Sequence, residues 1–242
     1  GQIQMHACGY SGHEEFNYVA LPYLFSDWDH FKEVVLGEIG KPWRESFTKK
    51  KGIKLIGIFE RGVRQLTTAN TPVKAPADCE GLLIRAPQID IFMETWKALG
   101  AKPEPIPFSE LYLALKTGVT NAQENPIELI LTKNFYEVQN YLILTKHVHL
   151  PHWIGMNNSF YNSLSNEHQN IIHESLDLAM KKNGELLNKT ENKMLAELKE
   201  KGMTVIEPDI PLFREATKGV AKKVNVEEIW GNGVYESIQN LR

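Results

Sequence analysis

The chain has 242 residues, of which 42% are hydrophobic and 24% are charged, an ordinary composition for a globular protein. Its formal net charge of −3 offers no basic surface for nucleic acid and no polybasic patch for a membrane, so neither partner is predicted. No apolar run reaches about 18 residues, so no membrane-inserted helix is predicted. Cys8 and Cys79 form no C-x-x-C pair, which favours two small buried residues over a disulfide or a metal site.

The first fifty residues alternate between strand and helix patterns. Residues 3–8 are typical of a buried strand, and residues 9–12 form a glycine-rich stretch that predicts a loop. Residues 26–29 fit a capping box that opens a helix running through Leu36. A second helix is expected at about 42–50.

The alternation continues through the next fifty residues. β-Branched residues at 53–59 and 63–68 predict two short strands. Residues 81–85 predict a further strand, and residues 89–99 predict a helix that Gly100 closes. Strands alternating with helices indicate an α/β architecture with largely parallel sheets and right-handed crossovers.

The segment 107–126 then changes from apolar to polar. Leu111, Ala114 and Leu115 recur at helical spacing, and Gly118 ends that helix. The chain continues through amide and carboxylate side chains to Asn125, where a short turn or an apolar strand would be expected. These polar groups therefore call for a specific role.

One long helix is predicted in the C-terminal third. No proline interrupts residues 166–201, only Gly184 weakens the pattern, and apolar residues keep a helical period. The segment is much longer than the roughly 8–20 residues usual for a globular helix. A coiled coil is one interpretation, but its heptads would be irregular. A helix laid across two lobes as a strut explains the length better.

The sequence lacks the familiar motifs of catalysis and cofactor binding. It contains neither a phosphate-binding G-x-x-x-x-G-K-[ST] loop nor an EF-hand loop. His147, His149 and His152 are the best metal candidates, because alternate residues of a strand share one face. Without a carboxylate or cysteine nearby, a polar strand edge is the favoured interpretation. We therefore predict no catalytic residue, no metal site and no cofactor.

Two arginines point instead to an anionic ligand. Arg85 ends the apolar run 82–84, and ligands of open α/β sheets gather outside the carboxyl ends of strands. Arg64 lies beside another predicted strand, and the amides at 121–125 could orient a guanidinium group or a bound oxygen. A surface ion pair is the alternative for either arginine. With Phe108 as an apolar wall, these forked guanidinium groups favour a pocket for a small carboxylate.

Several longer stretches resemble one family. Their order and spacing match a family signature; the stretches are "ALPYLF", "RQLTTANTPV", "GLLIRAP", "ALGAKPEPIPFSELYLALKTGVTNAQENP" and "FYEVQNYLILTKH". This signature is that of the solute-binding proteins of TRAP (tripartite ATP-independent periplasmic) transporters, the DctP-type family. The resemblance covers nearly the whole chain. It implies a periplasmic-binding-protein-like, two-lobed flytrap with a ligand cleft between the lobes and a long helix spanning both.

The resemblance also implies a division of the chain into lobes. Residues 1–62 and 151–190 would form lobe one, and residues 63–150 and 191–242 would form lobe two, with the helix shared. The family begins about two βα units before this chain does, so lobe one is expected to be incomplete at its N-terminus.

The expected partners and location follow from the same resemblance. The protein would be a periplasmic monomer made from a precursor with a signal peptide. It would bind a small organic acid and deliver it to the TRAP membrane permease.

Site residues are carried over from the resemblance one by one. Arg85 would be the principal carboxylate-binding arginine, and Asn125 the asparagine that fixes Arg85 and touches the ligand. Arg64 would be a second basic contact, Phe108 an aromatic wall, and His147 a polar residue near the cleft. Gln123 and Glu124 are expected only to brace the backbone near the hinge, and Tyr10 could face the cleft or pack beneath it.

Two other functions compete with a transport receptor. An α/β enzyme could act on a carboxylate substrate with His147 as general base, although no nucleophile or acid–base pair has suitable spacing. A ligand-free structural or sensory relative could also retain the fold. The sequence does not choose among sialic acid, a uronate, a C4-dicarboxylate and a 2-oxo acid as the ligand.

Overall fold

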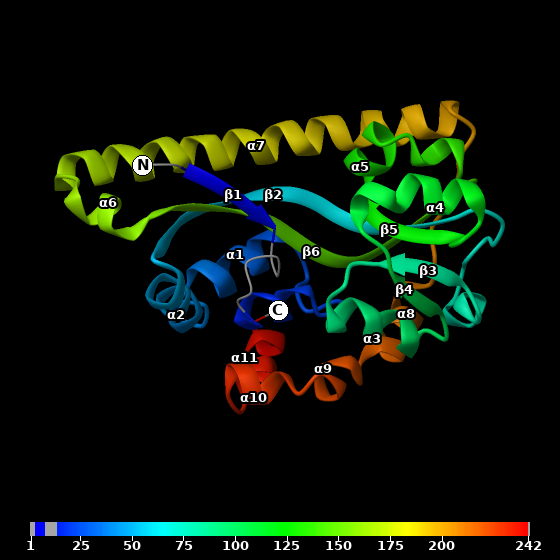
Figure 1. Cartoon of the computed structure of the whole chain (residues 1–242), viewed down its shortest axis with the longest axis horizontal. Helices are drawn as coiled ribbons and strands as arrows, with labels where there is room; N and C mark the ends of the chain where they lie inside the picture. Colours follow the sequence, from blue (N-terminus) through cyan, green and yellow to red (C-terminus); the bar gives the residue numbers. More distant parts are fainter. Residues whose placement is uncertain (1–2, 8–13, 242) are drawn as a thin grey trace.

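The computed structural model describes residues 3–7 and 14–241, which form a seven-stranded sheet with helices on both faces (Figure 1). The predicted loop at 9–12, with Tyr10 and the neighbouring Cys8, lies outside these residues. The strand order is β1-β6-β2-β5-β3-β4, and β7 pairs with β6. The strands are β1 (Ile3–Ala7), β2 (Ile53–Thr68), β3 (Leu83–Ala86), β4 (Lys102–Pro105), β5 (Ala122–Pro126), β6 (Tyr141–Asn157) and β7 (Thr204–Ile206).

Helices lie at both ends of the sheet, α7 runs along its length, and α9, α10 and α11 lie below its middle (Figure 1). Their bounds are α1 (Trp28–Leu36), α2 (Lys41–Lys51), α3 (Asp90–Ala98), α4 (Leu111–Thr117), α5 (Ile127–Thr132), α6 (Asn158–Ser163), α7 (Asn166–Glu200), α8 (Ile210–Thr217), α9 (Val220–Lys223), α10 (Val226–Trp230) and α11 (Val234–Asn240). The α1 and α2 helices lie near one end, and α3, α4 and α5 near the other. The α/β class is confirmed, while the proposed lobe boundaries stay a prediction.

Two long strands connect the two ends. The β2 and β6 strands pair antiparallel from Ile53 opposite Asn157 to Thr68 opposite Tyr141, with three shifts of register. One shift falls between Glu60 and Val63, around Gly62, whose φ of 83° suits glycine. The sequence predicted two separate strands here. The structure instead keeps one strand and absorbs the irregularity as a bulge.

The prediction of largely parallel sheets is wrong. The β3 strand pairs parallel with β4 and β5, and β6 pairs parallel with β7. The β2 strand is antiparallel to both β5 and β6, and β1 is antiparallel to β6. Because β2 and β6 cross from one end to the other in opposite directions, the middle of the sheet must be antiparallel.

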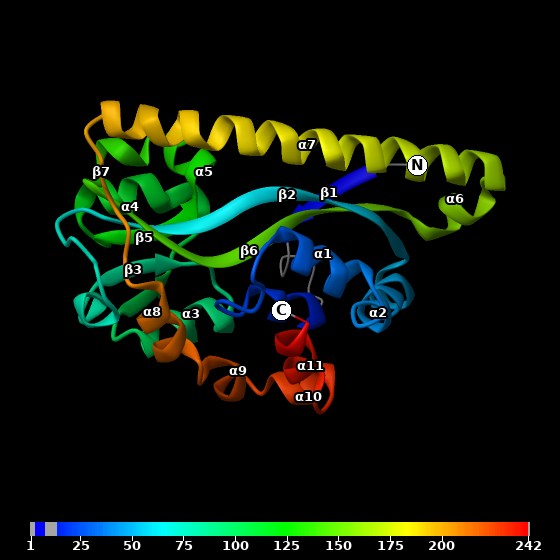
Figure 2. The ribbon, with the colours of Figure 1, turned by 180° about the vertical axis from the view of Figure 1, so that it is seen from behind.

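The long helix predicted at 166–201 is confirmed as α7, which has 35 residues. Ser165 caps its start by accepting a hydrogen bond from the backbone N–H of His168. The helix lies along the outer side of β2 and β6 and reaches both ends of the molecule (Figures 1 and 2). Leu176 packs over Gly57, and a Cβ atom at Gly57 would lie 3.6 Å from Leu176 Cδ1. Absence of a side chain at Gly57 thus lets the helix approach β2.

A side-chain hydrogen bond also fixes α7 to the bulge. Asn183 Nδ2 donates to the backbone oxygen of Glu60 at 2.8 Å. Gly184, the residue expected to weaken the helix, faces the same place, because a Cβ atom there would lie 3.9 Å from Glu60 Oε2. The middle of the helix is therefore attached to the most irregular part of β2.

The structure also agrees with the predictions for the first helix and for Cys79. Asp27 caps α1 by accepting a hydrogen bond from the N–H of His30 at 2.9 Å, and α1 ends at Leu36 as expected. Cys79 is buried and unbridged. Within the described ranges, no helix is long and apolar enough to cross a membrane.

Candidate functional site

A cavity of about 340 Å³ opens beside the sheet, against β2, β3, β5, β6 and α3. It brings together four of the five predicted ligand residues: Arg64, Arg85, Phe108 and Asn125. The remaining lining residues are Arg61, Pro87, Ile89, Phe92, Leu150 and His152. Guanidinium and amide groups thus face a largely apolar wall.

Two larger hollows, of about 750 and 500 Å³, lie near the C-terminal helices. Their walls include Lys222, Lys223 and Asn225, which come from the surface of α9 and the turn after it. We place the site in the smaller cavity, because two buried arginines, Arg64 of β2 and Arg85 of β3, converge there with the buried Asn125 of β5. Size alone does not indicate a ligand site.

The Arg64 side chain is held by a buried glutamate. Its Nε bonds to Glu124 Oε2, and its Nη2 donates to Glu124 Oε1 at 2.8 Å. The guanidinium group of Arg64 and the carboxylate of Glu124 are both buried, so their charges need each other. This two-point contact corrects the expectation for Glu124, which pairs with an arginine rather than merely bracing the backbone.

His147 is the second partner of Glu124. Its Nε2 lies 3.1 Å from Glu124 Oε2, and its Nδ1 lies 2.8 Å from Thr145 Oγ1. Burial by itself raises the pKa of the Glu124 carboxyl, but Arg64 and His147 outweigh burial and lower that pKa to about 2. His147 is absent from the cavity lining, and Glu124 connects it to the lining residue Arg64.

Asn125 completes the support of Arg64. Its Oδ1 accepts a hydrogen bond from Arg64 Nη2 at 3.1 Å, so the arginine that it fixes is Arg64 and not Arg85 as expected. The reason is the register of β2 and β5, in which Asn125 lies directly opposite Gln65, the neighbour of Arg64. The Arg85 side chain enters the cavity from β3, on the other side of β5.

A chain of buried amides determines which way Asn125 points. Asn125 Nδ2 donates to Gln123 Oε1 at 2.6 Å, and Gln123 Nε2 donates to Thr67 Oγ1 at 2.8 Å. Thr67 Oγ1 then donates to Gln139 Oε1 at 3.0 Å. Because its nitrogen donates to Gln123, Asn125 turns its oxygen, which can only accept, toward Arg64. The polar composition of β5 is explained by this network, since all five of its residues are buried.

Arg85 is arranged differently from Arg64. Its Nε donates to the backbone oxygen of Ile106 at 2.8 Å, and its guanidinium carbon lies 5.8 Å from the centre of the Phe108 ring. Phe108 belongs to the short 3-10 helix η4 (Phe108–Glu110) and is 37% exposed. Arg85 and Phe108 therefore form one wall of the cavity.

Two polar lining residues were not predicted as ligand contacts. Arg61 and Arg64 are three residues apart, so a regular strand would place them on opposite faces. The bulge between Glu60 and Val63 lets both line the same cavity. His152 was considered only as a metal candidate, and burial together with the charge of Arg61 lowers its pKa. In the described part of the chain, no three His, Cys, Asp or Glu side chains are placed to hold a metal ion.

Comparison with known proteins identifies the class to which this fold belongs, the two-lobed solute-binding proteins of the TRAP type. The chain belongs to the family described as Bacterial extracellular solute-binding protein, family 7 (DctP), which matches residues 1–228. The class predicted from the sequence is thereby confirmed, as is the two-lobed fold.

Curated relatives have related names. The chain is 36% identical over 210 residues to the Solute-binding protein RD1_1052 of Roseobacter denitrificans, covering 87% of this chain and 64% of that protein. It is 32% identical over 214 residues to the 2,3-diketo-L-gulonate-binding periplasmic protein YiaO of Escherichia coli, covering 88% and 65%. The chain thus spans just under two thirds of the length of these relatives.

Solved structures are similar over nearly the whole chain. A TRAP periplasmic solute binding protein from Roseobacter denitrificans with bound L-galactonate has a TM-score of 0.84 and 34% identity, covering 97% of this chain and 78% of that one. Another from the same species, with bound 3-deoxy-D-manno-oct-2-ulosonic acid, has a TM-score of 0.91 and 28% identity, covering 100% and 81%.

Proposed function

We propose that this protein is the periplasmic receptor of a TRAP transporter and that it captures a small organic acid in the cavity described above. The observation that carries the proposal is the convergence of Arg64, Arg85 and Asn125 on one partly apolar cavity. A carboxylate is the anion whose two oxygens match a guanidinium fork. The acids named in the related structures have such a carboxylate.

Arg85 is the residue that we assign to the ligand carboxylate. The charge of Arg64 is already matched inside the protein by Glu124, through two hydrogen bonds. The guanidinium group of Arg85 forms part of the cavity wall, and the bond from its Nε to the backbone oxygen of Ile106 holds it there. Arg64 and Asn125 would then contact a second oxygen of the acid, and Phe108 its carbon skeleton.

Delivery would depend on closure of the two lobes. The cavity is lined by Arg61 and Arg64 of β2 and by Leu150 and His152 of β6, the two long strands that connect the ends of the molecule. An acid that binds the closed form more tightly shifts the protein toward that form. The closed receptor would then present the acid to the membrane permease.

Calorimetry with a panel of acids tests this function. The panel contains L-galactonate, glucuronate, 3-deoxy-D-manno-oct-2-ulosonic acid, sialic acid and succinate, with galactose as the neutral control. We expect at least one acid to bind, the neutral sugar not to bind, and mass spectrometry to recover the acid unchanged. Arg85→Ala should weaken the binding strongly, whereas Arg214→Ala, at an exposed arginine on α8, should not affect it. Equal binding of acid and neutral sugar, or turnover of the acid, would contradict the proposal.

A further inference from the structure

His152 approaches the cavity from a different part of the sheet than Arg85. It lies opposite Phe59 of β2 in the antiparallel pairing of β2 and β6. Arg85 lies opposite Gln123 of β5, and Gln123 lies opposite Thr67 of β2. Because Phe59 and Thr67 are well separated along β2, His152 and Arg85 contribute to the cavity wall from opposite ends.

The ring of His152 has no hydrogen-bond partner among the described residues. The rings of His30, His147 and His173, by contrast, bond to a backbone oxygen, a carboxylate and a tyrosine hydroxyl. His149 also lacks a partner within the described ranges, but it does not line the cavity. His152 is therefore a polar group whose partner remains to be supplied at the site itself.

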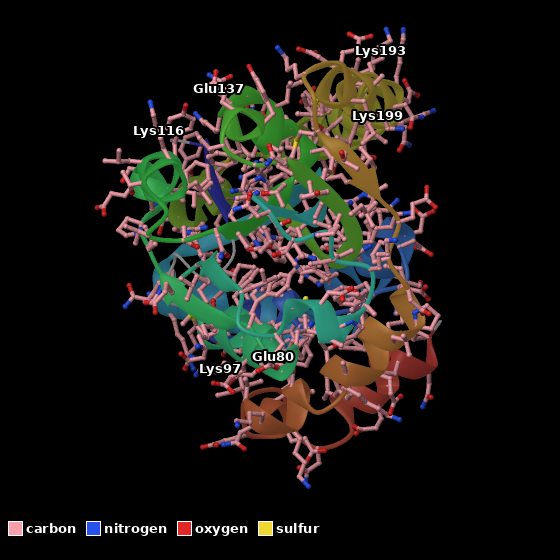
Figure 3. The ribbon with its side chains drawn as sticks, turned by 90° about the vertical axis from the view of Figure 1, so that its right-hand side faces the viewer. Glu80, Lys97, Lys116, Glu137, Lys193 and Lys199 are labelled. Atoms are coloured by element: carbon pink, nitrogen blue, oxygen red, sulfur yellow. The ribbon has the colours of Figure 1, made fainter. Side chains whose placement is uncertain are left out.

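Water can serve polar groups at the surface but not inside a filled cavity. Lys116 and Lys193 are exposed and project from the edge of the molecule in Figure 3. His152 is instead half-buried on β6, which β1 and β2 flank, and it is part of the cavity wall. A ligand that displaces water from this ring must replace the lost hydrogen bond, because an unpaired buried polar group is costly.

The chemistry of the lining selects the kind of group that can do so. Guanidinium groups only donate, and the amide of Asn125 already bonds to Arg64 through its oxygen and to Gln123 through its nitrogen. Burial and the charge of Arg61 lower the pKa of His152, which favours the neutral ring with one donor and one acceptor nitrogen. A hydroxyl group both donates and accepts, so it matches this ring, whereas a carboxylate only accepts.

We propose that the bound acid is hydroxylated and that His152 binds a hydroxyl group at the end of the ligand away from its carboxylate. This inference rests on the proposed function, in which Arg85 holds the carboxylate. The ligand then runs along the cavity past Asn125 and Arg64, and its class is that of the sugar acids. An unsubstituted dicarboxylate, with its second carboxylate at Arg61, is the alternative.

Competition calorimetry with acids of equal chain length tests the ligand class. L-galactonate, glucuronate and 3-deoxy-D-manno-oct-2-ulosonic acid have hydroxyl groups, whereas hexanoate, adipate and octanoate have none. We expect the tightest hydroxylated acid to bind about tenfold or more tightly than every acid without hydroxyl groups. Adipate or hexanoate binding equally well would overturn this inference while leaving the proposed function intact. If no acid binds, the proposed function fails and this inference fails with it.

Substitution of His152 tests its assigned role. His152→Phe keeps a ring but removes both nitrogens, so it should weaken binding of the tightest hydroxylated acid about tenfold and leave the affinity for hexanoate unchanged. His152→Gln keeps one donor and one acceptor and should recover part of the loss. His168→Phe, at an exposed histidine near the start of α7, is the matched control and should have no effect.

Two results for His152→Phe would overturn the assignment. Equal weakening of hydroxylated and unhydroxylated acids would mean that His152 only supports the shape of the cavity. Unchanged affinity for every acid would mean that the ligand does not contact His152. Circular dichroism checks that each variant is folded, and the comparison of acids on the wild type does not depend on any variant.

Discussion

Replacing Glu124 with glutamine should destabilise the protein by an amount that depends on pH. The substitution keeps the shape of the side chain but removes the charge that matches buried Arg64. A pKa held at about 2 instead of 4.5 corresponds to about 3 kcal/mol of folding free energy at neutral pH. The general cost of breaking a buried ion pair, about 3–5 kcal/mol, gives a similar figure.

The pH dependence of this loss follows from its sign. Because the pKa of Glu124 is lowered in the folded protein, its stabilisation is complete above pH 4.5 and is lost as the pH falls toward 2. Wild type and Glu124→Gln should therefore differ by about 3 kcal/mol at pH 7 and should converge near pH 2. At that pH the wild-type carboxyl is protonated and resembles the amide.

Urea unfolding of both proteins at several pH values measures this difference. Glu104→Gln, at an exposed glutamate on β4, is the matched control and should follow the wild type throughout. A Glu124→Gln variant that is as stable as wild type at pH 7 would refute the argument. A difference that is constant from pH 7 to pH 2 would also refute it, because the loss would then be steric.

Further predictions concern the cavity, the long helix and the bulge. Calorimetry should show that Arg85→Lys weakens acid binding, because an ammonium group lacks the planar fork, and that Arg85→Ala costs about 2–5 kcal/mol, more than Arg64→Ala. Equal affinity of wild type and Arg85→Lys would remove Arg85 from the site. Asn183→Pro should cost about 3 kcal/mol or more in urea unfolding and alter lobe closure in small-angle scattering, with Asn183→Ala as control; unchanged closure would contradict the strut. Burial and the nearby Glu191 raise the pKa of Glu60 to about 7, so ionisation of Glu60 lowers the stability of the folded protein as the pH rises above 4.5. Glu60→Gln should therefore be more stable than wild type at pH 8 but not at pH 4, and the opposite order would show that the pKa is not raised.

Local sequence patterns were sufficient to predict α1, α2, α3, α4 and α7, but not α5, α6 or the helices from α8 to α11. The apolar period and the absence of proline positioned α7 within one residue of its observed end, and Gly118 ends α4 as expected. Pairing between distant strands could not be predicted in this way. The antiparallel crossing of β2 and β6 depends on contacts between residues about 75 to 105 positions apart, such as Ile53 with Asn157.

The site shows the same division between local and distant information. Arg85 follows an apolar strand and precedes a proline, so its position could be predicted from neighbouring residues. Arg61 could not, because strand alternation assigns it to the wrong face and only the bulge corrects this. The partner of Asn125 was also wrong, since the register of β2 against β5, and not proximity in sequence, places Arg64 beside it.

The two arginines of the cavity differ in a way that bears on how ligand binding would work. A guanidinium group held by Glu124 and Asn125 has a fixed position before any ligand arrives, and Arg64 keeps that position without an acid. The guanidinium group of Arg85 donates to the backbone oxygen of Ile106 and lies against the Phe108 ring, and both contacts orient it at the cavity wall. We expect a ligand carboxylate to meet Arg85 at this wall. The amide chain from Asn125 to Gln139 would hold Arg64 beside Glu124, so that the Arg64 side chain does not move into the space of the ligand.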